Sequence, residues 1–421
     1  MDEEVINWDD YIAVASQSDV GMRRSNNQDN LSVSIASSPE QWRRNGHLFV
    51  VADGMGAHAA GELASKLAAD NLSHLFVRNA GEPIDIRFRK SIEQTNLEIH
   101  RRGQANPDFY NMGTTCSALA LTSHGAVLGH VGDSRVYRLR QNRLEQLTFD
   151  HSLVWELRAS GQLKGDNESS VPKNVITRSL GPYAEVKVDL EGPFPLEPGD
   201  TFLLCSDGLT GVVADDEIGP ILSTLSVDEA AEVLINLANL RGGPDNITVI
   251  VVRILKRVRK ATETASQEDE GSQSLWLPVS WGIFALMIIV AALIGLWQSS
   301  LLAAAVPGVA ALVALVVALV ITARQLGSDD ANGIRGAFGK APYTQTNVAC
   351  SKDLIERLHH TVREILETAR KDQWNLRWSE IEERLTQIRS HEDKAEYREA
   401  MAAYCRLIIF IMKQVRRRPP E

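Results

Sequence analysis

The chain has 421 residues and a net charge of −10 at pH 7, with 44% hydrophobic and 23% charged residues. A chain of this length exceeds a single compact core, so we expect two or more domains. This balance of apolar and charged residues is typical of globular proteins and argues against extensive disorder. The acidic charge argues against nucleic acid as a partner, because nucleic-acid binding requires a basic surface.

The chain contains four cysteines, Cys116, Cys205, Cys350 and Cys405, which are far apart in the sequence. A zinc site built on cysteine is therefore not expected. Cys116 and Cys205 lie within apolar runs and are interpreted as small buried hydrophobic residues, which fits a reducing compartment. The acidic N-terminus does not have the pattern of a signal peptide, so we expect the first domain to remain in the cytoplasm.

Composition divides the chain into four regions. Residues 8–255 alternate strand-like and helix-like segments and predict the first domain. Residues 256–276 are charged and polar and predict a linker. Residues 277–323 are overwhelmingly apolar, and residues 351–417 have the periodicity of helices.

The apolar region predicts two transmembrane helices. Residues 279–297 and 301–323 contain no charged residue, and each run can cross about 30 Å of hydrocarbon as a helix. Basic residues lie before the first run and at Arg324 after the second, so the positive-inside rule places both flanking domains in the cytoplasm. We therefore predict a multi-pass protein of the cell membrane. The alternative is a buried apolar hairpin within a water-soluble fold.

Residues 351–417 carry three apolar stripes at spacings of three and four. The stripes are Leu354, Leu358, Val362 and Ile365; then Trp374, Trp378, Ile381, Leu385 and Ile388; then Tyr397, Met401, Tyr404, Ile408 and Ile411. They predict an all-α C-terminal region, interpreted as a small three-helix bundle. The alternative is that short coiled coils form a homodimer or bind a protein partner.

Aspartates at the ends of strands indicate the chemistry of the first domain. Apolar runs lead into Asp53-Gly54, Gly132-Asp133 and Asp207-Gly208, and Asp245 precedes the apolar run at residues 247–252. A strand end holds an aspartate on a rigid frame, and a neighbouring glycine allows close approach of the backbone. One Asp-Gly pair alone is more often a plain turn. Four in one domain predict an all-oxygen site, which suits magnesium or manganese.

Upstream of these aspartates, Arg24 lies five residues before Asp29. A planar guanidinium matches the oxygens of a phosphate group in a bidentate manner. Taken alone, Arg24 is better interpreted as an ordinary surface arginine.

The ordered set of motifs resembles the metal-dependent protein phosphatases, the type 2C serine/threonine family, in its bacterial branch. The matching pieces are Arg24 with Asn27-Gln28-Asp29; Asp53-Gly54-Met55-Gly56 with His58; Gly113-Thr114-Thr115; Gly132-Asp133-Ser134-Arg135; Asp150-His151-Ser152; Thr177-Arg178; Ser206-Asp207-Gly208; and Asp245-Asn246-Ile247-Thr248. The resemblance covers roughly residues 11–254. No single piece is specific, but their order is.

The resemblance implies an α+β fold, a four-layer α-β-β-α sandwich in which two antiparallel sheets pack face to face between helices. The sequence supports this independently. Residues 115–121, 126–131 and 136–139 predict consecutive strands joined by short turns. Residues 61–77 and 84–101 predict a pair of helices.

The resemblance also implies a cofactor of two Mn²⁺ or Mg²⁺ ions and a role for each aspartate. Asp53 would bridge the two ions, and the carbonyl of Gly54 would bind one of them. Asp207 and Asp245 would complete the shell of the first ion, and Asp29 would hold the second.

Three further roles follow from the same resemblance. Asp133 would help to hold a third, weaker metal ion, Arg24 would grip the phosphate, and residues 152–180 would form a mobile flap beside the cleft. Two close cations lower the pKa of a bridging water, and the hydroxide would attack phosphorus in phosphoserine or phosphothreonine. We therefore expect the catalytic set to be Arg24, Asp53, Asp207 and Asp245.

Three positions depart from the family pattern. Gln28 stands where many relatives carry Glu, Ala57 where Gly is usual, and Val171 where His commonly precedes proline. We expect Gln28 to weaken the second metal site, and the other two to affect substrate preference and rate.

The main hypothesis is an active phosphatase at the membrane, with phosphorylated proteins from serine/threonine kinases as its partners. One alternative is a weakly active or inactive phosphoprotein-binding module. Another is a phosphatase specialised for a single regulator of the anti-sigma-factor type.

Overall fold

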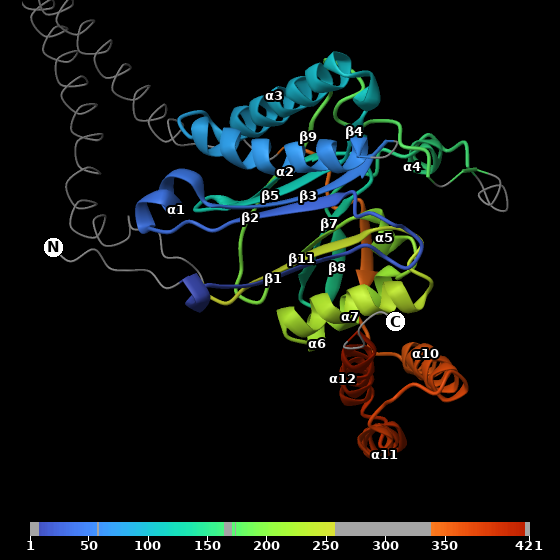
Figure 1. Ribbon diagram of the computed structural model, residues 1–421. Helices are drawn as coiled ribbons and strands as arrows, with labels where there is room; N and C mark the ends of the chain where they lie inside the picture. The colour runs from blue at the N-terminus through green and yellow to red at the C-terminus, as the bar shows by residue number, and fades with distance from the viewer. Residues whose placement is uncertain (1–7, 57–58, 164–170, 173, 257–337, 417–421) are drawn as a thin grey trace, which may run out of the picture. The chain divides into compact units, whose positions relative to one another are not determined.

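The computed structural model describes residues 8–56, 59–163, 171–172, 174–256 and 338–416 (Figure 1). All of these residues belong to one compact unit. The predicted linker beyond residue 256 and the predicted transmembrane segment at residues 277–323 lie outside the described residues.

One of two antiparallel sheets carries a pair of helices on its outer face. Its strands, in spatial order, are β2 (Asp29–Ser34), β3 (His47–Met55), β5 (Cys116–Thr122), β6 (Gly125–Val131) and β9 (Asp189–Phe194), and β4 (Gly113–Thr114) pairs with the end of β3. The helices α2 (Ala60–Arg78) and α3 (Ile84–Ala105) cover this sheet. Gly129 on β6 allows α3 to approach closely, because a Cβ there would lie 2.7 Å from the ring of Phe88.

The second sheet packs against the first and has its own helices outside. Its strands, in spatial order, are β1 (Ile12–Asp19), β11 (Ile247–Ile254), β10 (Thr201–Cys205), β7 (Arg135–Arg140), β8 (Arg143–Gln146) and β12 (Thr344–Asn347). The helices α6 (Asp215–Thr224) and α7 (Val227–Leu240) cover its outer face. A capping box fixes the start of α7, since the side chain of Ser226 accepts from the backbone of Glu229 and Glu229 accepts in return.

Short elements complete the first domain. They are η1 (Trp8–Asp10), α1 (Pro39–Asn45), η2 (Pro107–Phe109), α4 (Leu153–Ala159) and α5 (Asp207–Thr210).

This architecture confirms the predicted α+β sandwich of two sheets between helices. The helices predicted at residues 61–77 and 84–101 form as α2 and α3. The three consecutive strands predicted after residue 114 also form, as β5, β6 and β7. β5 and β6 pair in the first sheet, but β7 belongs to the second. The turn at residues 132–134 carries the chain from β6 in one sheet to β7 in the other. Asp133 therefore lies where the two sheets meet.

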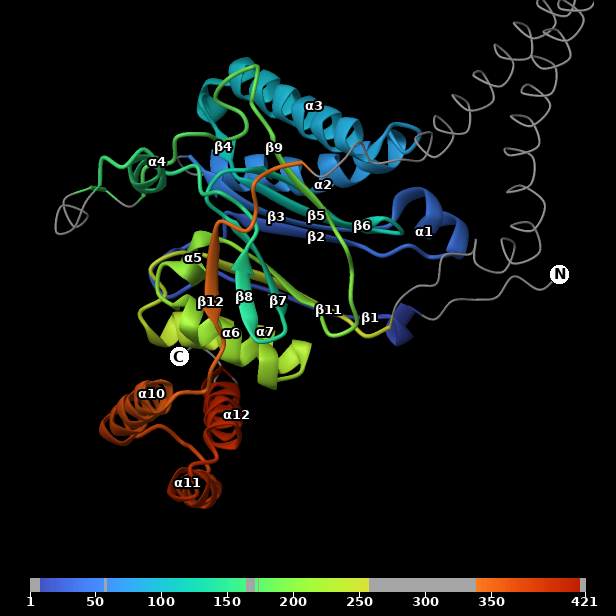
Figure 2. The same ribbon diagram turned by 180° about the vertical axis from the view of Figure 1, so that it is seen from behind.

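The C-terminal region is helical, as its apolar stripes predicted. It contains α10 (Lys352–Lys371), α11 (Trp378–Asp393) and α12 (Tyr397–Arg416). α12 contacts both other helices and packs on α7, so its buried residues join one continuous core with the second sheet (Figure 2). Ion pairs of 2.8 Å join α12 to α7, from Arg406 to Glu229 and from Lys413 to Glu232.

The prediction of a multi-pass membrane protein with cytoplasmic flanking domains is corrected by the structure. In the part of the chain that the structure describes, no helix combines the length and the apolar surface needed to span a bilayer. The 20-residue helices α10 and α12 are long enough, but they carry charged side chains, including Arg406 and Lys413. The prediction rested on two uncharged runs that lie outside the described residues, and it is withdrawn.

Candidate functional site

Asp29 and Asp53 lie side by side where two strands of the first sheet pair. β2 begins at Asp29, which is directly opposite Asp53 in the register with β3. Asp53 is fixed by Thr115, whose hydroxyl accepts from the Asp53 amide at 2.9 Å and whose own amide donates to the Asp53 carbonyl at 2.8 Å. Both carboxyl groups are thus held by a paired backbone rather than by a loop.

The second sheet contributes a hydroxyl that holds Asp29. Ser206, at the end of β10, donates to Oδ2 of Asp29 at 2.7 Å and accepts from the amide of Thr248 on β11 at 2.9 Å. The amide fixes the direction of the hydroxyl, because an oxygen that accepts from the backbone is left with its proton for Asp29. Asp29 is therefore bound by both sheets.

Asp207 and Asp245 come from the second sheet. Asp207 follows β10 directly and begins α5, and its carboxyl shares a hydrogen bond with Asp53. Asp245 precedes β11, and its Oδ2 accepts from Arg24 at 2.8 Å in an ion pair that is exposed to solvent.

Asn246 ties the segment that carries Arg24 to this site. Its Oδ1 accepts from the amide of Gln28 at 2.8 Å, and its Nδ2 donates to the carbonyls of Val20 at 2.8 Å and Asn26 at 3.0 Å. The sequence reasoning assigned no role to Asn246, Ser206 or Thr115. The only signal was that each belongs to a recognised motif, Thr115 with Gly113, Ser206 with Asp207 and Asn246 with Asp245.

Burial makes the carboxylate cluster electrostatically costly. It raises the pKa of Asp29 to about 7 and that of Asp133 to about 8, with repulsion from Asp207 adding to both. Burial and the neighbouring carboxylates also raise the pKa of Asp53 well above its ordinary range, and that of Asp207. Such a cluster needs positive charge nearby.

Two of the buried oxygens have no hydrogen-bond partner. They are Oδ1 of Asp29 and Oδ1 of Asp133. A buried carboxylate oxygen without a donor costs free energy, and a divalent cation would satisfy it. Oxygen-only donors also match the preference of manganese and magnesium. The unpartnered oxygens and the oxygen-only donor set therefore fit the Mn²⁺ or Mg²⁺ ions that the motifs implied.

As the side chains stand, no three acidic, histidine or cysteine groups in the described residues converge tightly enough to hold a metal ion. Two of the predicted ligands are engaged elsewhere, Asp245 with Arg24 and Asp207 with Asp53. Binding a metal would require these side chains to rotate. Besides burial, repulsion from Asp29, Asp133, Asp207 and Asp245 contributes to the raised pKa of Asp53, so the five carboxyl groups lie in one neighbourhood.

The backbone around Gly54 is packed so closely that only glycine fits. A Cβ there would collide with the carbonyl of Gly61, and its amide donates to the carbonyl of Gln28 at 3.1 Å. Nε2 of Gln28 donates to the carbonyl of Gly56 at 3.3 Å. Gln28 therefore supports the turn after Asp53 from the position where a carboxylate was expected.

A cavity of about 310 Å³ opens beside Asp133 and Asp207. Its other lining residues are Arg135, Asp150, Ser152, Val154, Trp155, Arg158, Asn174, Thr210 and Gly211. Arg135 and Asp150 form a largely buried ion pair of 2.7 Å in its wall. Several lining residues belong to α4 and to the predicted flap at residues 152–180.

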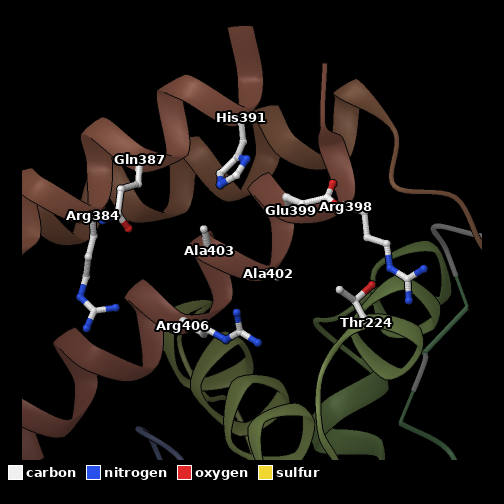
Figure 3. Close-up of a pocket in the computed structure, with 9 residues that line it drawn as sticks. All are labelled: Thr224, Arg384, Gln387, His391, Arg398, Glu399, Ala402, Ala403 and Arg406. Atoms are coloured by element: carbon white, nitrogen blue, oxygen red, sulfur yellow. The ribbon is translucent and has the colours of Figure 1, made fainter. Parts of the chain in front are cut away.

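A second cavity, of about 420 Å³, lies between α11, α12 and the end of α6 (Figure 3). Figure 3 shows the side chains of Arg384, Arg398 and Arg406 at separate positions around it. Arg406 pairs with Glu229, and Arg398 donates to the carbonyl of Ser223. Its cations neither converge nor lie beside the aspartates, so the first cavity is the candidate site.

Two sheets that bring five aspartates close together, two of them lining one cavity, define a class of proteins suited to divalent-metal chemistry. The chain belongs to the protein phosphatase 2C family, whose model matches residues 22–239. The resemblance seen in the motifs is confirmed.

Individual relatives match the first domain over nearly their whole length. The serine/threonine phosphatase stp of Listeria welshimeri is 40% identical over 242 residues, which are 56% of this chain and 93% of that protein. The crystal structure of the Mycobacterium tuberculosis serine/threonine phosphatase PstP/Ppp is similar with a TM-score of 0.52 and 36% identity, over 58% of this chain and 100% of that one. A PstP catalytic domain in complex with two manganese ions has a TM-score of 0.50 and 36% identity, over 58% and 99%.

Proposed function

We propose that the chain is a protein serine/threonine phosphatase that hydrolyses phosphoserine and phosphothreonine with two Mn²⁺ or Mg²⁺ ions. The observation that carries the proposal is the buried aspartate cluster, contributed by both sheets and adjoining one cavity. Membership of the protein phosphatase 2C family and the manganese-bound relative support it.

Asp53 is the proposed ligand shared by both ions, because it lies between Asp29 in its own sheet and Asp207 in the other. The Gly54 carbonyl and Asp245 would complete that set. Two such ions supply a hydroxide near neutral pH and offset charge on the phosphoryl group. Asp133, with its unpartnered oxygen at the cavity, is the proposed ligand of a third, weaker ion.

Arg24 is the proposed phosphate-binding residue. Its guanidinium lies at the solvent-exposed edge of the cluster, 2.8 Å from Asp245. If Asp245 turned toward a metal ion, Arg24 would be released and could form two charge-assisted hydrogen bonds with phosphate oxygens. The loop that carries Arg24 keeps its place through Asn246. Arg24 would thus change partner without a change in the backbone.

The cysteines support hydrolysis without a covalent enzyme intermediate. Cys116 is fully buried, and burial raises the pKa of its thiol to about 12. Burial also raises the pKa of the Cys205 thiol. A nucleophilic cysteine needs an exposed thiolate, so neither residue can attack phosphorus.

Two observations favour the alternative, a weakly active or inactive phosphoprotein-binding module. Asp245 is paired with Arg24, and Gln28 replaces an expected carboxylate next to Asp29. In either case the proposed partners are proteins that serine/threonine kinases have phosphorylated. A second copy of the chain or a protein partner bound through the C-terminal helices stays a prediction, tested by analytical ultracentrifugation of the full chain.

The test is hydrolysis of a phosphothreonine peptide by the full chain with manganese, with magnesium and with a chelator. We expect turnover that depends on metal and is lost in Asp207→Asn. Titration calorimetry would measure metal binding on the same sample. Metal binding without turnover in the wild type would refute the phosphatase proposal and support the binding module.

A further inference from the structure

We infer that a strap at residues 338–347, which leads into the C-terminal helices, supports one wall of the substrate cleft from behind. In this inference Tyr343 is a positioning residue that sets the cleft wall through Phe149 and Trp155. The inference rests on the proposed function, because it concerns binding of the same phosphorylated substrate. The family model ends at residue 239, so the strap lies outside the match.

The strap joins the edges of both sheets. Phe338 exchanges two backbone hydrogen bonds with Gly192 on β9, at 3.1 and 2.7 Å. A few residues later, β12 pairs with β8 at the edge of the other sheet. Figure 2 shows this segment running beside the edge of the sandwich before it enters the C-terminal helices. Opening of one sheet relative to the other would break one of these pairings.

Glu191 anchors the strap at its centre. Its Oε2 accepts from the amides of Lys340 and Ala341, both at 2.9 Å, and its Oε1 accepts from the hydroxyl of Tyr343 at 2.5 Å. Gly339 lies against the same carboxylate with a φ of +88°, and a Cβ there would collide with it. Glu191 is only 3% exposed, so the strap supplies the donors that this buried charge requires.

The aromatic ring of Tyr343 connects this anchor to the cleft. It packs on Phe149 with ring centroids 5.4 Å apart, and Phe149 meets Trp155 edge-on at 5.5 Å. Trp155 lines the cavity beside Asp133, where the guanidinium of Arg135 lies over its ring at 5.6 Å. Three rings therefore run from the strap to the cavity wall.

A second connection runs through polar groups. The amide of Tyr343 donates to the carbonyl of Gln146 at 2.9 Å, and Nε2 of Gln146 donates to Oδ1 of Asp150 at 2.7 Å. Asp150 pairs with Arg135, and both line the cavity. Without the strap, Gln146 would lose its backbone hydrogen bond to Tyr343. Gln146 would then hold Asp150, and with it the Asp150–Arg135 ion pair, less firmly.

The two connections meet at Arg135 and Trp155, which is why the strap should act on substrate binding. A cleft wall held in place before the substrate arrives lowers the cost of ordering it on binding. A residue that acts only on this wall should change KM for a peptide, whose chain lies along the wall. It should leave kcat and a small substrate nearly unchanged.

The experiment compares Tyr343→Ala and Tyr343→Phe in the full chain, with a phosphothreonine peptide and p-nitrophenyl phosphate as substrates. We expect Tyr343→Ala to raise the peptide KM about five- to tenfold, the range expected from loss of one aromatic contact, with little change in kcat. Tyr343→Phe keeps the ring and should restore most of the wild-type KM. Gln345→Ala, on the same strand but exposed, is the matched control and should behave as wild type.

Phe149→Leu tests the same connection without altering the strap, and it should raise the peptide KM if Tyr343→Ala does not fold. Peptide affinity by fluorescence anisotropy in an Asp207→Asn background gives a readout that needs no turnover. If Tyr343→Ala and Phe149→Leu both kept the wild-type peptide KM and peptide affinity, the inference would be overturned. Equal loss with both substrates, or in Gln345→Ala, would also overturn it, because it would show a purely structural role. A wild type that binds peptide without turnover would instead refute the proposed function alone.

Discussion

Asp29 and Asp53 occupy directly opposite positions on β2 and β3, and Ser206 of the other sheet donates to Asp29 at 2.7 Å. Two carboxylates in register across a strand pair repel each other, so this arrangement weakens the sheet unless positive charge is bound there. A hydroxyl from the second sheet fixes one of the two acids. The site is thus a property of how the two sheets pack.

The Ser206 hydroxyl gives a prediction about metal affinity. Ser206→Ala removes the donor that orients Asp29 and leaves the cluster's carboxylates in place. Residues that orient a metal ligand typically contribute about 10- to 100-fold in affinity or activity, so we expect a loss in that range. Manganese titration calorimetry measures it. Ser223→Ala is the control, because its hydroxyl bonds only to the Pro220 carbonyl and the Thr224 hydroxyl within α6. Equal affinity in Ser206→Ala and wild type would contradict the assignment of Asp29.

Arg24 gives a prediction that separates activity from stability. Its ion pair with Asp245 is exposed, and such pairs contribute about 1 kcal/mol or less to stability. Arg24→Ala should therefore unfold at nearly the wild-type urea concentration. If Arg24 binds the phosphate, kcat/KM should fall about 100-fold, as for loss of one preorganised donor. Arg102→Ala, which breaks an exposed pair on α3, is the control. A stability loss that matched the activity loss would contradict the proposed role.

The sequence was most informative where a motif is local. Asp53 and Asp207 could be placed near strand ends because each apolar run and its Asp-Gly pair lie within about ten residues. The structure puts Asp207 just after β10, but β3 continues through Asp53 and Gly54 to Met55. The pairing of Asp245 with Arg24 could not be predicted, since it joins residues 221 positions apart and depends on side-chain rotation. The roles of the aspartates as metal ligands stay predictions.

The strap escaped prediction for a different reason. β12 is a short polar strand, Thr-Gln-Thr-Asn, without the apolar alternation by which strands are recognised. It pairs with a strand 200 residues earlier. The C-terminal helices were predicted from their stripes, but stripes do not show what they pack against. In the structure, α12 packs against α7 of the first domain.

The shared core predicts that the C-terminal helices stabilise the first domain. Ile408 on α12 is fully buried in the core that contains α7. Ile408→Ala should lower the free energy of unfolding of the full chain by about 2–5 kcal/mol, the usual cost of such a cavity. Urea unfolding followed by circular dichroism measures the loss, with His360→Ala on the exposed face of α10 as the control. A loss below about 1 kcal/mol would show that α12 and α7 do not form one core in solution.

The aspartate cluster predicts an unusual dependence of stability on pH when metal is removed. Asp29 and Asp133 have pKa values of about 7 and about 8 in the folded chain, raised mainly by burial from an ordinary value of 3.8. At pH values between 3.8 and about 7 to 8, these two carboxyl groups are protonated in the folded chain and ionised in the unfolded chain. The free energy of unfolding of the chelated protein should therefore fall as pH rises from about 5 to 8.

Metal should reverse this trend, because a divalent cation binds the ionised carboxylates and competes with protons. The measurement is the melting temperature from pH 5 to 8, with a chelator and with excess manganese. We expect the difference between the two curves to widen as pH rises. The Asp29→Asn, Asp133→Asn double variant should make the chelated curve less steep, since amides do not titrate, while Asp53 and Asp207 still do. A chelated wild type whose melting temperature rose over this range would show that other groups dominate and that these two carboxyls are ionised without metal.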